Sequence, residues 1–153
     1  RHTPTRFHEG IAMNSTSSTL LATAAFAGLV AAAPAYSMAM SNLPPEHVQG
    51  TVAYRTGGIG HDEAVAMRKT ESQYPLSVEF LKHATPVEPL ASVDVTISNA
   101  QGTTDLSAIS VGPYLLAKLP AGKYTIAATH DGKTKSRGFV IAANKPEHLT
   151  FEW

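Results

Sequence analysis

Residues 114–130 read YLLAKLPAGKYTIAATH, and this stretch decides the fold class. Its first half is a run of apolar residues that ends at Pro120-Ala121-Gly122, where proline and glycine favour a turn. After the turn, residues 124–130 alternate between larger apolar and smaller or polar side chains, which is the period-two pattern of a half-buried strand. The stretch therefore predicts two strands joined by a tight corner.

The same pattern extends over the rest of the second half of the chain. The segment SVDVTIS at 92–98 shows the cleanest alternation, and Asp131-Gly132 is a two-residue hairpin signal that leads into a strand over 133–142. Further strands are expected at 48–54, 76–80, 103–110 and 148–153, and one helix at 61–74, which ends before Pro75.

These segments predict an all-β, antiparallel sandwich of about seven strands with one short helical insertion. One side of the alternating strands should supply a single core. The expected core residues are Val93, Val95, Ile97, Leu119, Tyr124, Ile126 and Phe151.

Composition excludes several kinds of site. The chain has no cysteine, which removes a thiol nucleophile, a thiolate zinc site and a lipidated cysteine. From residue 40 onward there are ten lysines and arginines against eleven aspartates and glutamates, so the net charge is −1. Binding to nucleic acid or anionic lipid needs clustered cations, so we expect neither, and no motif calls for a cofactor.

The N-terminal part has the pattern of an export signal. Residues 20–33, LLATAAFAGLVAAA, form an uncharged stretch of fourteen residues. This is too short to span a bilayer but has the length of a signal-peptide core. Small residues then offer cleavage sites after Ala39 or after Ala35. We therefore expect an exported protein that starts at Met13 and has no membrane span after cleavage.

The expected domain organisation follows from these boundaries. It comprises upstream residues 1–12, a signal peptide at 13–39, a linker at 40–47 that contains Pro44-Pro45, and one β-sandwich domain at 48–153.

Two segments carry a family resemblance. Residues 92–97, SVDVTI, and residues 116–126, LAKLPAGKYTI, resemble the carboxypeptidase regulatory-like domains, in which a strand runs into an L-P-A-G-x-Y corner. The resemblance implies a transthyretin-like, or prealbumin-like, sandwich. It also implies a non-catalytic module that binds a protein partner or a cell-envelope glycan. With the signal peptide, the chain is similar to small periplasmic proteins of Gram-negative bacteria, which gives the expected location.

The segment before and within the predicted helix is not required by a sandwich, and we interpret it as a recognition surface. Its apolar stripe is narrow, so we expect the helix to gain little from packing on its own sheet. The alternative is that the helix covers an open edge or face of a sheet. The candidate partner-binding residues are Gly57, Gly58, Ile59, Gly60, His61, Met67 and Tyr74.

Two other functions remain as alternatives. His61, Asp62 and Glu63, together with His47 or His83, contain the ligand types of a small metal-handling protein. Consecutive helical residues point about 100° apart, so these three need outside ligands to converge on one ion. A hydrolase on a transthyretin-like scaffold is the third possibility, although no G-x-S-x-G nucleophile motif is present.

Overall fold

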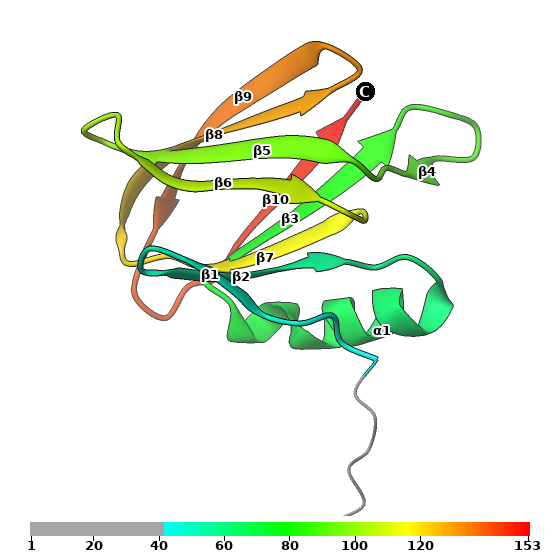
Figure 1. Ribbon diagram of the computed structural model, residues 1–153, viewed down its shortest axis with the longest axis horizontal. Coiled ribbons are helices and arrows are strands. Elements are labelled where there is room, and N and C mark those ends of the chain that lie inside the picture. Colours follow the sequence, from blue (N-terminus) through cyan, green and yellow to red (C-terminus); the bar gives the residue numbers. More distant parts are fainter. Residues whose placement is uncertain (1–41) are drawn as a thin grey trace, which may run out of the picture. The chain divides into compact units, whose positions relative to one another are not determined.

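The computed structural model describes residues 42–153, which form ten strands, one α-helix and one turn of 3₁₀ helix. The strands make two sheets, of six and four strands, packed on a common core (Figure 1). The mainly β, sandwich-like fold is therefore confirmed, although the described residues hold ten strands rather than about seven. The predicted signal peptide at 13–39, with its cleavage sites, lies outside the described residues.

The six-stranded sheet has the order β1-β2-β7-β3-β10, with β4 paired to β3, and the four-stranded sheet has the order β6-β5-β8-β9. Strands β6, β7 and β8 follow one another in the chain but alternate between the sheets, so the chain crosses from one sheet to the other twice within this segment. The elements are β1 (His47–Gln49), β2 (Val52–Gly57), α1 (His61–Thr70), η1 (Glu71–Gln73), β3 (Leu76–Lys82), β4 (Glu88–Pro89), β5 (Val93–Asn99), β6 (Thr104–Ser110), β7 (Tyr114–Lys118), β8 (Gly122–His130), β9 (Lys133–Ile141) and β10 (Glu147–Glu152).

One strand pair departs from the expected antiparallel arrangement. Strands β3 and β10 run parallel, with Leu76 opposite Glu147 and Phe80 opposite Phe151. A parallel pair needs a long connection, and the chain between these strands passes through both sheets before it returns. The expectation of a wholly antiparallel sandwich is therefore wrong at this pair.

The expected strand at 48–54 is instead a hairpin of β1 and β2. Gly50 has a φ angle of 59°, in the left-handed region that glycine adopts without strain, and the turn at 50–51 separates the two strands. The Gln49 side chain then accepts a hydrogen bond of 2.8 Å from the Ser107 N–H on the edge strand β6. The split of this expected strand adds one strand, and the two-residue β4, which no sequence pattern indicates, adds another.

The core lies between the sheets and contains every core residue expected from the sequence. Val93, Val95, Ile97, Leu119, Tyr124, Ile126 and Phe151 are all buried in one cluster. Tyr124 is the most exposed of them, at only 8%. Removal of these apolar faces from water is the main stabilising contribution to the sandwich.

The turn between β8 and β9 has the predicted chemistry. Asp131 and Gly132 have φ angles of 47° and 71°, which two-residue hairpins of this kind require. The hairpin places Thr129 opposite Thr134 and runs in register to Gly122 opposite Ile141.

Helix α1 and η1 cover the outer face of the six-stranded sheet (Figure 1). The predicted helix at 61–74 is confirmed, with its last turn as 3₁₀ helix and Tyr74 already extended before Pro75. Met67 is completely buried and packs with Tyr74 against Tyr114 and Leu116 of β7. This packing favours the alternative in which the helix covers a sheet face. Within residues 42–153, no helix is long and apolar enough to cross a membrane.

Candidate functional site

The residues expected to form a recognition surface divide between the interior and the surface. Gly57, Gly58, Met67 and Tyr74 are buried, whereas Ile59, Gly60 and His61 are exposed. The exposed part is therefore limited to two loop residues and the first residue of α1, with Ile59 at 62% exposure as its one large apolar side chain. The rest of the segment holds the helix onto the sheet.

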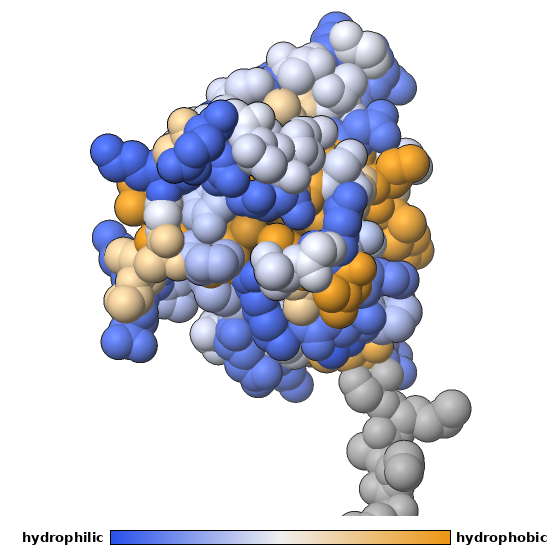
Figure 2. Space-filling model, turned by 60° about the vertical axis from the view of Figure 1, so that its left-hand side comes forward, coloured by the Kyte–Doolittle hydropathy of each residue, from blue (hydrophilic) through white to orange (hydrophobic). Residues whose placement is uncertain are grey.

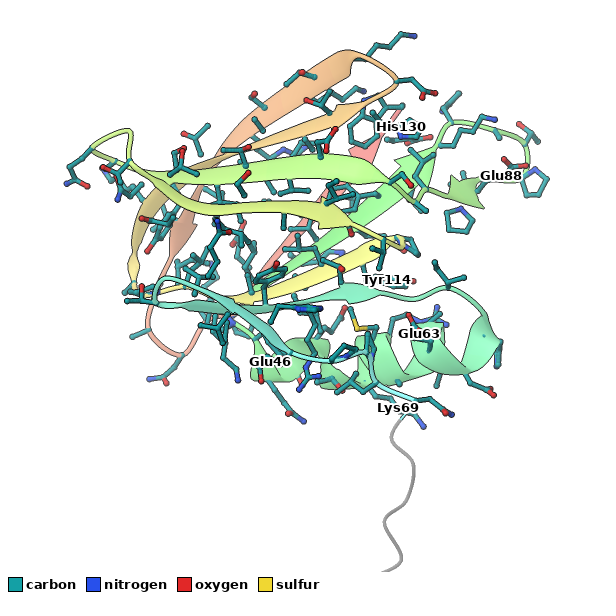
Figure 3. The ribbon with its side chains drawn as sticks, viewed as in Figure 1. Glu46, Glu63, Lys69, Glu88, Tyr114 and His130 are labelled. Atoms are coloured by element: carbon teal, nitrogen blue, oxygen red, sulfur yellow. The ribbon has the colours of Figure 1, made fainter. Side chains whose placement is uncertain are left out.

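The glycines and Glu63 explain the shape of this loop. Gly58 has a φ angle of 96°, and a Cβ atom there would overlap the Tyr114 ring, so the backbone lies directly on that side chain. Glu63 Oε1 accepts hydrogen bonds from the backbone N–H groups of Gly58 at 2.6 Å and Ile59 at 3.4 Å (Figure 3). Glu63 thus holds the two residues that precede the N-cap Gly60, and it does not cap the helix itself.

The same geometry bears on the metal-handling alternative. The Glu63 carboxylate is turned toward the loop backbone, while His61 and Asp62 are exposed. Among residues 42–153, no three side chains of the histidine, cysteine, aspartate or glutamate type lie close enough together to hold a metal ion.

Glu46 is the centre of a polar network beside the helix (Figure 3). Its Oε1 accepts hydrogen bonds from Lys118 Nζ at 2.7 Å and from Tyr74 Oη at 3.3 Å, and its Oε2 lies 3.4 Å from Arg55 Nη2. Arg55 also donates from Nε to Tyr74 Oη at 2.7 Å and from Nη1 to the Pro44 carbonyl. The segment expected to be a linker at 40–47 is therefore held against the domain where the structure describes it.

Charge pairing in this network shifts two pKa values. The hydrogen bond from Lys118 lowers the pKa of Glu46, and the positive charges of Lys118 and Arg55 act in the same direction. The same hydrogen bond raises the pKa of Lys118. Both groups are thereby kept charged, and the contacts they make are internal, so the network acts as an anchor for residues 42–46.

A different arrangement occurs where the two sheets separate. Along β9, one face carries Lys133, Lys135 and Arg137 and then Phe139 and Ile141, because alternate residues of a strand share a face. Phe139 and Ile141 are buried in the core, whereas every residue from 133 to 138 is exposed. The inner face of β9 therefore changes from apolar to cationic where it leaves the core.

These cations lie over the aromatic side chains of β10 and the C-terminal residue. Lys135 Nζ is 5.9 Å from the ring centroid of Trp153, and Arg137 Cζ is 5.4 Å from that of Phe151. Lys135 Nζ also donates to the Glu152 carbonyl, and Trp153 Nε1 donates to the Lys133 carbonyl at 3.0 Å. Cation–π contacts of this kind contribute about 0.5–1 kcal/mol at exposed sites.

Two neighbouring cavities open here, and we name them together the β9–β10 groove. The larger, of about 560 Å³, is lined by Lys135, Ser136, Arg137, Thr150, Phe151 and Glu152. The smaller, of about 170 Å³, is lined by Lys82, His130, Asp131, Lys133 and Trp153. A third hollow of about 550 Å³, near Tyr74 and Ile141, has only Lys145 as a charged lining residue. The groove thus differs from that hollow in its charge.

His130 is the unusual side chain of the smaller cavity (Figure 3). Its Nε2 lies 3.4 Å from Asp131 Oδ2, and its ring meets Trp153 edge-on at 6.0 Å between centroids. Its Nδ1 is buried without a hydrogen-bond partner in the part of the chain that the structure describes. A buried polar atom without a partner is uncommon, and here it lies beside an opening.

No protein-family model matches the chain, and no curated protein matches it. The candidate site is therefore defined by its own residues and geometry. Sequence reasoning did not single out Lys133, Lys135 and Arg137, although KTKSR at 133–137 has a cation at every second position. This pattern of cations indicates a binding site only when β9 and β10 are known to be edge strands.

The aromatic residues form no continuous exposed platform among the described residues. Tyr74 and Tyr114 are buried under the helix, and Trp153 is half-buried against Phe80 and Phe151. On the face drawn in Figure 2, hydrophobic side chains likewise occur in separate patches among hydrophilic ones.

Proposed function

We propose that the domain is a non-catalytic binding or accessory module of the periplasm, which recognises a protein partner or a cell-envelope glycan through the β9–β10 groove. The observation that carries the proposal is the position of Lys135 and Arg137 over Trp153 and Phe151, where the sandwich opens. Aromatic surface, cations and an accessible hollow are the components from which ligand sites are built.

The carboxypeptidase regulatory-like identity of the sandwich is part of this proposal. The L-P-A-G-x-Y corner supports it, because Leu119 and Tyr124 both enter the core on either side of the turn. The Tyr124 hydroxyl also donates a hydrogen bond of 2.8 Å to the Pro120 carbonyl, which links the turn to the strand that follows it. In such modules the sandwich is a rigid scaffold and the ligand binds at its edge or loops.

A comparison of captured partners tests the role of the groove. The full chain is expressed with residues 13–39 retained, crosslinked mildly in the periplasm and isolated, beside the double variant Lys135→Glu/Arg137→Glu. Lys69→Glu/Lys123→Glu makes the same charge change at exposed positions on α1 and β8. We expect the groove variant to lose the bound material and the control variant to keep it.

Fractionation of the same cells shows whether the protein is in the periplasm or in the cytoplasm. If the chain stays in the cytoplasm, or if both variants capture the same material as the unchanged protein, the proposal is contradicted. Circular dichroism of each variant shows whether its fold is retained, so that a loss of binding is not confused with unfolding.

A further inference from the structure

The charges that line the β9–β10 groove are unequal. Its two cavities are lined by four cations, Lys82, Lys133, Lys135 and Arg137, and by two acids, Asp131 and Glu152. Each acid has a histidine beside it: Glu152 Oε1 lies 2.6 Å from His83 Nδ1, and Asp131 Oδ2 lies 3.4 Å from His130 Nε2. The groove therefore has an excess of positive charge in a domain whose residues 40–153 carry a net charge of −1.

Most of these cations are not used to pair with the protein's own carboxylates. Among residues 42–153, neither Lys133 nor Arg137 forms an ion pair, and Lys135 contacts a carbonyl. Lys82 lies 3.8 Å from Glu88, but both side chains are more than half exposed, and such pairs contribute little. The positive charge is thus available to a ligand.

The cations are also spread along the groove. Lys135 and Arg137 line the larger cavity, and Lys82 and Lys133 line the smaller one together with Trp153, whose ring centroid is 5.9 Å from Lys135 Nζ. A small single anion would contact one pair only. A ligand with negative groups at intervals along an extended chain would meet both pairs at once, and its binding would gain from both.

We propose that the β9–β10 groove binds an acidic glycan, a chain of sugars that carry carboxylate groups. This inference rests on the proposed function and names its ligand class. The Arg137 guanidinium offers two parallel N–H donors that match a carboxylate, and the lysines supply point charges on either side. Trp153 supplies apolar ring surface in the smaller cavity, against which the apolar face of a sugar ring can pack, while its own N–H group is held by the Lys133 carbonyl.

The chain carries its own probe, because Trp153 is its only tryptophan. The full chain is titrated with a hexasaccharide of galacturonic acid while tryptophan fluorescence is recorded, and with neutral maltohexaose as the comparison. We expect a saturable change with the acidic sugar and binding at least roughly tenfold weaker with the neutral one. Added salt should weaken the acidic binding, because the attraction is between exposed charges.

Substitutions in the groove and at control positions show where the acidic hexasaccharide binds. Lys135→Glu/Arg137→Glu should weaken binding of the acidic hexasaccharide at least roughly tenfold. Lys135→Gln/Arg137→Gln, which removes the charges without reversing them, should also weaken this binding and replaces the first variant if charge reversal disturbs the fold. Lys69→Glu/Lys123→Glu should bind like the unchanged protein. Binding that persists in both groove variants would contradict the proposal.

Other results would separate this inference from the proposed function. Equal binding of neutral and acidic sugars would overturn the acidic ligand but keep a glycan-binding module. No sugar binding, with partners still captured in a groove-dependent way, would overturn the glycan and keep a binding module. Tighter binding of a hexathymidine oligonucleotide than of the acidic sugar would overturn the ligand class, because it would show a preference for phosphates.

Discussion

At the scale of single residues, alternation within a strand decides which side chains enter the core. In β8 the side chains of Tyr124, Ile126 and Ala128 are buried and that of Thr125 is exposed, as the sequence predicts. Tyr124 adds two specific contacts to its burial. Its ring stacks on Phe139 at 5.6 Å between centroids, and its hydroxyl donates to the Pro120 carbonyl.

Substitutions at adjacent positions of β8 test this assignment. We expect Tyr124→Ala to lower the free energy of unfolding by about 3–5 kcal/mol, and Tyr124→Phe by about 1 kcal/mol through loss of the hydrogen bond. Thr125→Ala should change it by less than about 0.5 kcal/mol. Urea denaturation measures all three, and similar losses at positions 124 and 125 would mean that the assigned strand face is wrong.

At the scale of elements, the bounds of the helix were predictable, but its packing was not. Acidic residues in its first turn, basic residues in its last turn and Pro75 indicate where it begins and ends. Its narrow apolar stripe suggested weak packing, yet Met67 is completely buried. The reason is that Tyr114 and Leu116 point outward from the sheet and make an apolar patch under the helix.

The helix should therefore stabilise the domain. We expect Met67→Ala to cost about 2–5 kcal/mol of unfolding free energy, in the range for a buried residue of this size. Lys69→Ala, on the exposed side two residues later, should change it by less than about 0.5 kcal/mol. Thermal unfolding compares the two variants. A variant without residues 56–73 that remains folded would contradict the structural role.

At the scale of the whole molecule, local patterns predicted the two-sheet fold and its core but not the candidate site. Periodicity and turn residues act within a few positions of each other, so they predict strands and the Asp131-Gly132 hairpin. The parallel pairing of β3 with β10 joins residues far apart in the chain. This pairing makes β10 an edge strand, and without it no local pattern brings Trp153 beneath Lys135.

The central claim is that ligands bind at the β9–β10 groove and not at the loop before α1. Amide chemical shifts of the full chain, recorded by NMR during titration with the galacturonic acid hexasaccharide, test it most directly. We predict that the shifts that move belong to residues 133–137 and 150–153, while those of 57–74 stay in place. Shifts that move mainly at Ile59, Gly60 and His61, or a spectrum that does not change, would contradict the claim.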